Sequence, residues 1–204
     1  RPPAPEEKKA WEALPFDEEA YRSREMEVTE LTGEPECSVL ERVWARPSLD
    51  VHGVRGGFTG EGAKTVIPAS ATAKISMRLV ADQSPEGAFL QFRQAVASAC
   101  PRGVSAAVRL IHSAAPSLVD PSNRFIRAAA DAMREVFGRE TVYIRSGGSI
   151  PIVGLFDRYL GVPSVLMGFG LPDDNLHAPN EKFHLPNFFK GIEAVARYLE
   201  RLGE

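Results

Sequence analysis

The chain has 204 residues and is 44% hydrophobic, enough to bury a sizeable core in one large domain or two small ones. Its net charge of -3 at pH 7, without a basic stripe, excludes the electrostatic signature of a nucleic-acid or anionic-membrane partner. No run approaches the roughly eighteen apolar residues of a membrane-spanning helix, and no signal peptide is recognisable.

The cysteines bear on the cellular compartment. Cys37 and Cys100 lie far apart and show neither a CxxC spacing nor the density of a disulfide scaffold, so we expect free thiols. Free thiols are typical of a reducing compartment, which makes the cytoplasm the expected location. Because the chain starts at Arg1 without a methionine, we also expect the natural N-terminus to lie further upstream.

The first part of the chain mixes helices and strands. Residues 1–36 are rich in proline and glutamate and contain one short predicted helix, residues 17–24, with Asp17 as its N-cap. Residues 49–54 form a strand candidate, and residues 70–80 alternate between apolar and polar side chains, the pattern of a half-buried strand.

A helix and another strand candidate follow. An amphipathic helix is predicted to begin at Pro85, and residues 104–114 return as a strand. The first part of the chain is therefore predicted to be α+β, with helices on one face of an antiparallel sheet.

After residue 116 the order becomes helix, strand, loop, helix, strand, loop, helix, which is typical of an α/β arrangement. The first helix is closed by Gly138, and the last spans residues 186–202. Only residues 141–145 and 163–168 are strand candidates, fewer than a doubly wound sheet normally has. This part is expected to complete a sheet whose other strands lie outside the sequence.

His177 is the first candidate for chemistry, because it follows the strand candidate 163–168, at the end of a strand where α/β proteins usually build their sites. Asp173 and Asp174 could join it around a metal. Zinc needs three or four ligands, however, and this short segment cannot wrap an ion alone. A surface histidine is the alternative interpretation of His177.

The sequence "RSGGS", from Arg145 to Ser149, precedes the predicted helix that begins near Ile150. Glycines and free backbone N–H groups at a helix start favour an anion site, and a carboxylate fits better than a nucleotide phosphate. Simple capping of the helix by Ser149 is the alternative, although it leaves Gly147, Gly148 and the nearby Arg145 unexplained.

Thr65, Arg78 and His112 are polar residues on or beside the strand candidates of the first part. Taken singly, Arg78 fits a solvated strand face and His112 fits a structural histidine among apolar neighbours. Their local patterns leave both interpretations open.

Three stretches, taken in order, resemble the M20 family of zinc metallopeptidases, and most closely its branch of cytosolic nonspecific dipeptidase and carnosinase. They begin with "GEPECSVLERVWARPSLDVHGVRGGFTGEGAKTVIPASATAKISMRLVADQSPE" and continue with "RSGGSIPI" and "NLHAPNEKF". The resemblance implies a lid and dimerisation domain over residues 1–115, its first strand and helix missing. Residues 116–204 would be the C-terminal segment of the α/β catalytic domain.

The resemblance also implies a site. His177 matches the last ligand of a centre with two zinc ions, whereas the other ligands and the general base have no match in this sequence. Thr65 and Arg78 match substrate-contact positions. Arg78, Gly147, Gly148 and Ser149 would hold the terminal carboxylate of a small peptide. His112 would be catalytic, polarising the scissile carbonyl or stabilising the oxyanion.

The implied function is amide hydrolysis by a zinc dipeptidase that forms a homodimer through the lid. Since most metal ligands are absent, we expect the chain alone to be inactive. Two alternatives stay open: a non-catalytic dimerisation or binding module, and an N-acyl amino acid amidohydrolase of the same family.

Overall fold

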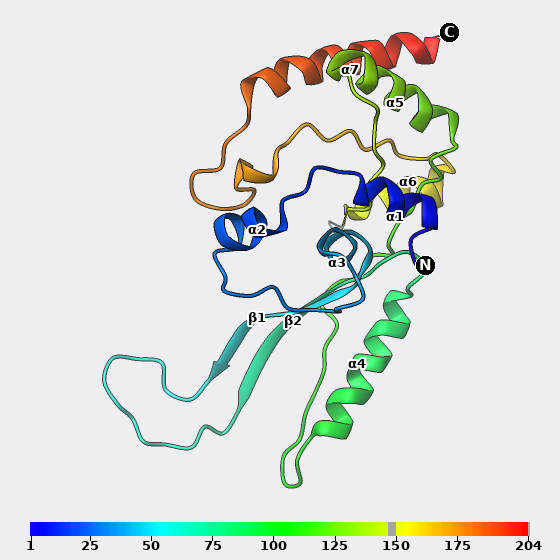
Figure 1. The fold of residues 1–204 in the computed structure, drawn as a ribbon. Helices are drawn as coiled ribbons and strands as arrows, with labels where there is room; N and C mark the ends of the chain where they lie inside the picture. The colour runs from blue at the N-terminus through cyan, green and yellow to red at the C-terminus, as the bar shows by residue number, and fades with distance from the viewer. Residues whose placement is uncertain (147–149, 204) are drawn as a thin grey trace.

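The computed structural model describes residues 1–146 and 150–203. Figure 1 shows the β-hairpin and α4 at one end, α5 and α7 at the other, and α1 and α3 between them. The elements, in chain order, are α1 (Pro5–Glu12), α2 (Glu18–Ala20), a π-helical turn (Tyr21–Glu25), α3 (Val39–Ala45), β1 (Ser48–Gly56), β2 (Ala71–Arg78), α4 (Pro85–Ala99), α5 (Arg124–Phe137), α6 (Pro151–Leu160), a 3₁₀ turn (Pro172–Asp174) and α7 (Leu185–Gly203).

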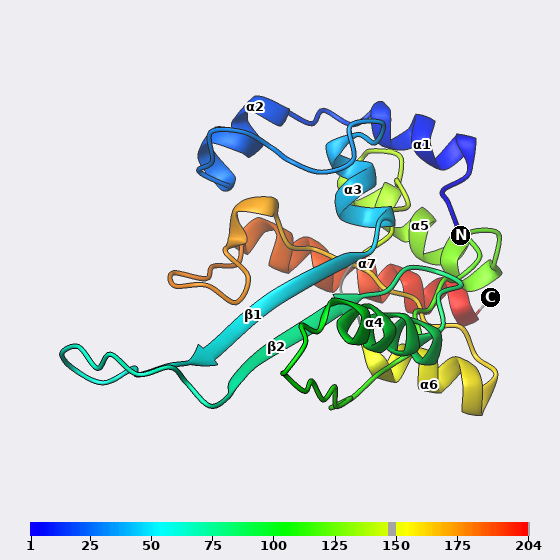
Figure 2. The ribbon, with the colours of Figure 1, turned by 90° about the horizontal axis from the view of Figure 1, so that it is seen from below.

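The sheet is a two-stranded antiparallel hairpin of β1 and β2. Its register runs from Ser48 opposite Arg78 to Gly56 opposite Ala71, with an irregularity between Val51 and Gly53. This confirms the strands predicted at 49–54 and 70–80. The connecting loop extends well beyond the strands as a long arm (Figure 2). An isolated hairpin is marginally stable at best, so this element depends on what packs around its root.

The other three predicted strands are wrong for this chain. Residues 104–114, 141–145 and 163–168 have no strand assignment, although all of them are described. A strand is defined by hydrogen bonds to a neighbour as much as by its own alternation or apolarity. Within the described residues, these three segments find no such neighbour.

The helix boundaries follow capping signals in the sequence. Asp17 Oδ1 accepts a hydrogen bond from the Ala20 N–H at 2.9 Å, and Ser84 Oγ accepts one from the Gly87 N–H at 3.1 Å. Helix α5 ends at Gly138, which adopts φ 68°. These caps confirm the predicted short helix and the predicted start of α4 and end of α5. Helices α1 and α3 were not predicted.

Helices α5 and α7 pack closely through small residues (Figure 1). Ala132 and Ala194 are fully buried, and Phe169 contributes to the same core by stacking on Phe137 at a centroid distance of 6.4 Å. A second small core surrounds the buried Trp11 of α1. Much of α7 stays exposed, with Leu185 and Phe189 at 67% and 64% exposure.

Cys37 and Cys100 are both free thiols, as predicted. None of the helices that the structure describes combines the length and apolarity needed to cross a membrane.

We expect Gly138→Ala to destabilise the chain by about 1 kcal/mol, because an L side chain resists the left-handed backbone that ends α5. A Cβ at this position would meet no atom within 4 Å, so backbone strain alone would be measured. The measurement is the free energy of unfolding in denaturant.

The matched control is Gly87→Ala in the first turn of α4, where a Cβ would make ordinary contact with Ser84 at 3.5 Å. It should leave stability unchanged or raise it by up to about 1 kcal/mol, as alanine favours helix. Equal effects of the two substitutions would contradict the cap assignment.

Candidate functional site

The segment that carries His177 is a closed loop before α7. Asp174 is only 1% exposed, and its Oδ2 accepts a hydrogen bond from the Leu171 N–H at 2.7 Å. The Asp174 carbonyl oxygen accepts another from the Lys182 N–H at 3.0 Å, and the Lys182 ammonium pairs with Asp173. Side-chain and main-chain bonds together therefore fix where the loop begins and ends.

The backbone of this loop is unusual. Asn175, His177 and Asn180 adopt φ values of 54°, 61° and 62°, in the left-handed region that non-glycine residues seldom visit. Asparagine and histidine tolerate this region better than most residues do. The closed loop holds His177 in this conformation with its side chain exposed, where an imidazole nitrogen is accessible.

The two neighbouring acids do not join His177 in a metal site. A hydrogen bond from Lys182 lowers the pKa of Asp173, and Asp174 is turned inward. The described residues contain no group of three or more His, Cys, Asp or Glu side chains that could hold a metal. Among the described residues this loop therefore offers a single exposed imidazole, His177, and not the three or four ligands of a complete metal site.

Asp174 is a loop-forming residue that sequence reasoning missed. Its Oδ1 is buried and has no hydrogen-bond partner among the described residues. The signal available in the sequence was Pro172, which starts a turn. The third residue of that turn, Asp174, can accept a hydrogen bond from the Leu171 N–H. The side chain therefore shapes the loop that presents His177.

The predicted substrate residues lie on separate segments. Arg78 is the last residue of β2, Thr65 lies in the loop between the strands, and His112 lies in the extended segment after α4. All three side chains are exposed. An apolar pocket of about 370 Å³ is lined instead by residues of α7 and its surroundings, including Phe169, Phe183 and Phe188.

The predicted anion site spans residues 145–149, ahead of α6 in the sequence. Gly147, Gly148 and Ser149 lie outside the described residues. Helix α6 begins at Pro151 and its N-cap is Ile150, one position later than the capping alternative required.

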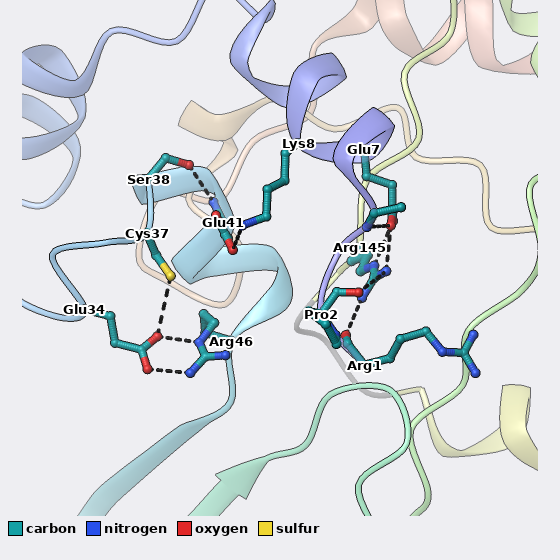
Figure 3. A network of polar contacts seen from close by, with 11 residues as sticks. Arg1, Pro2, Glu7, Lys8, Glu34, Cys37, Ser38, Glu41, Arg46 and Arg145 are labelled. Atoms are coloured by element: carbon teal, nitrogen blue, oxygen red, sulfur yellow. Dashed lines mark hydrogen bonds and ion pairs between the residues drawn. The ribbon is translucent and has the colours of Figure 1, made fainter.

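Arg145, at the edge of that predicted site, is already engaged elsewhere. Its Nε and Nη2 donate to the two carboxylate oxygens of Glu7 in α1, at 2.8 and 2.7 Å (Figure 3). The Arg145 and Glu7 side chains are 11% and 26% exposed. The expectation that Arg145 contributes to an anion site is therefore wrong for the described structure: the anion it binds is Glu7.

The carboxylate of Glu7 is held in its charged form. Burial raises the pKa of Glu7, but hydrogen bonds from Arg145 and from the Ala4 N–H, together with the Arg145 charge, outweigh it. The net pKa lies below the ordinary value of 4.5. The pair therefore stabilises the fold fully when the pH is above the ordinary pKa of 4.5, and this contribution is lost as the pH falls through the lowered pKa of the folded state.

Helix α1 makes a second contact with the segment that carries Arg145 and also packs on α3. The Trp11 Nε1–H donates to the Tyr143 carbonyl at 2.9 Å, and the Trp11 ring meets Trp44 of α3 edge to face at 5.4 Å. The Lys8 ammonium pairs with Glu41 of α3 at 2.8 Å (Figure 3). The signal for this helix was present in "PEEKKAWE", with proline at the first position and glutamate at the third.

Comparison with known proteins extends over almost the whole chain. Residues 5–201 match peptidase family M20/M25/M40. The chain is 34% identical to the Cys-Gly metallodipeptidase DUG1 of Saccharomyces cerevisiae, over 97% of this chain and 42% of that protein. It is 29% identical to the human Beta-Ala-His dipeptidase, over 98% of this chain and 40% of that protein.

Solved structures of dipeptidases have a similar fold to this chain. The fold matches the yeast di-peptidase Dug1p with a TM-score of 0.81 at 34% identity, covering 98% of this chain and 42% of that one. It matches human carnosine dipeptidase 1 with a TM-score of 0.79 at 30% identity, covering 97% and 42%. The chain thus spans less than half the length of these relatives. The resemblance drawn from the sequence is confirmed: this chain belongs to peptidase family M20/M25/M40.

Proposed function

We propose that this chain is the C-terminal part of a zinc-dependent dipeptidase that hydrolyses the amide bond of small peptides with a free C-terminal carboxylate. The observation that carries the proposal is the family match from residue 5 to residue 201, with relatives that are dipeptidases. A specificity for N-acyl amino acids is the alternative substrate class, because a carboxylate clamp serves both.

The domain organisation follows the same proposal. Residues 1–115 form most of a lid domain through which two copies associate, and residues 116–204 return to the catalytic domain. The exposed apolar face of α7 supports the proposal that a further part of the catalytic domain covers it. The cytoplasm is the proposed location, and the two free thiols support it.

The residues of this chain take separate roles. His177 holds a zinc ion through its imidazole, and its exposed, loop-fixed position supports that role. Zinc, when bound, lowers the pKa of a water molecule towards neutrality. Arg78 and residues Gly147, Gly148 and Ser149 bind the substrate carboxylate, with Thr65 as a further substrate contact.

His112 has the chemical role. A neutral or charged imidazole N–H can donate a hydrogen bond to the oxygen of the scissile carbonyl, where negative charge develops as the bond is attacked. The His112 side chain is exposed. To contact a substrate at the loop that carries His177, the segment around residue 112 must approach that loop. Closure of the lid or association of two subunits would bring it there.

We expect the 204-residue chain alone to bind zinc more weakly than about micromolar and to hydrolyse no dipeptide, because one histidine cannot close a coordination sphere. Calorimetric titration with Zn²⁺ and a dipeptide hydrolysis assay are the measurements. His177→Asn, which suits the left-handed backbone, is the control. A micromolar site that this substitution abolishes, or turnover by the chain, would refute the expectation.

In the complete enzyme, we expect Arg78→Ala to weaken use of a dipeptide with a free carboxylate by on the order of 2 to 5 kcal/mol, the effect of truncating one partner of a buried charge pair. The measurement is kcat/KM for the dipeptide and for its C-terminal amide. The amide lacks the anion, so it should be a poor substrate that loses little more. Equal losses for both substrates would show that Arg78 is structural.

Also in the complete enzyme, we expect His112→Ala to lower kcat by roughly 10²–10³, as the loss of one oxyanion donor does. Metal content and thermal unfolding should stay near those of the parent. Unchanged turnover would reduce His112 to a packing role. Mixing His112→Ala subunits with His177→Asn subunits tells whether His112 serves its own site or its partner's, since only the second case restores activity.

A further inference from the structure

Helix α1 lies at a junction of three parts of the chain (Figures 1 and 3). Its own contacts reach α3, which leads directly into β1, and the segment 141–146, which leads towards residues 147–149. The residues just before it reach the end of β2, where Arg1 Nε and Asp82 Oδ2 are 2.8 Å apart. A displacement of any one of these three parts relative to α1 must therefore alter the contacts that the other two make.

Arg145 forms the densest contact at this junction. Beyond its two bonds to Glu7, its Nη1 donates to the Arg1 carbonyl at 2.8 Å, and Nη2 reaches the Pro2 carbonyl at 3.4 Å. Glu7 Oε2 also accepts from the Ala4 N–H at 2.7 Å. A planar guanidinium in a two-pronged pair fixes direction as well as distance, which a point charge does not.

The chain of contacts leads from Arg145 to the hairpin root in two steps. Arg145 binds the Arg1 main chain, and the Arg1 side chain pairs with Asp82, four residues beyond Arg78. The Arg1–Asp82 pair is more than half exposed and is weak by itself. The junction is stabilised by the partly buried Glu7–Arg145 pair and by Trp11, which is only 2% exposed.

We propose that Arg145 is a positioning residue, which through Glu7 fixes the segment 141–146 relative to the hairpin that carries Arg78. This inference rests on the proposed function, in which Arg78 and the residues after segment 141–146 bind the same substrate carboxylate. Arg145 acts without touching substrate, since its donors are taken up by Glu7 and the main chain. Its effect on binding passes through Glu7.

The kinetic test uses Glu7→Gln, Arg145→Gln and the double variant in the complete enzyme, with Arg197→Gln as control. Among the residues that the structure describes, Arg197 makes only exposed ion pairs, on α7. Each single variant should lower kcat/KM for a free-carboxylate dipeptide roughly 10- to 100-fold, as an error of about 1 Å in placement does, mainly through KM. The amide of the same dipeptide should be affected by less than about twofold.

The double variant should be no worse than either single one, because both remove the same link. Full additivity, an effect of Arg145→Gln without one of Glu7→Gln, or equal losses for dipeptide and amide would each overturn the proposal. Glu7→Gln is the decisive variant, since glutamine can still accept the Ala4 N–H and should spare the fold.

A distance measurement on the 204-residue chain separates this inference from the proposed function. Spin labels at Ser76→Cys, exposed on β2, and Arg139→Cys, exposed after α5, are introduced in a background without Cys37 and Cys100. Glu7→Gln should broaden the distance distribution, and Arg197→Gln should leave it sharp. An unchanged distribution in Glu7→Gln overturns the positioning role, whether or not the complete protein proves to be a dipeptidase.

Discussion

The pairing of Glu7 with Arg145 is the interaction on which the described arrangement most depends. The chain has little conventional core: its buried side chains gather around Trp11 and between α5 and α7, while the hairpin and α4 bury almost nothing. Because segments distant in sequence share few apolar contacts, directional polar contacts determine their relative orientation. A bidentate pair of low exposure, flanked by an indole hydrogen bond, supplies this direction across 138 positions of sequence.

The same scarcity of core explains which sequence predictions succeeded. Caps act locally, so Asp17, Ser84 and Gly138 marked helix boundaries correctly. The hairpin was predictable because each of its strands pairs with its neighbour along the chain. Residues 104–114 were also predicted as a strand but have no partner among the described residues, and no local signal could have revealed this.

The site was predictable to a different extent at each residue. The placement of His177 in a turn before the last helix followed from its polar surroundings, whereas the inward turn of Asp174 did not, because an acid in a polar loop normally faces water. Arg145 misled for a physical reason: an arginine beside glycines indicates an anion, and the anion proved to be a glutamate far away in sequence. Long-range ion pairs leave no periodic pattern to detect.

The hairpin described above has a consequence for how this polypeptide behaves in solution. With two strands only among the described residues, both outer edges carry rows of peptide groups that no ladder satisfies. Val51 and Val54 are more than half exposed beside them, so the ribbon offers both a template and an apolar surface for strand addition. Lys74 and Arg55 place positive charges along it and oppose stacking of identical ribbons. Self-association through these edges should therefore strengthen with added salt, which screens that repulsion.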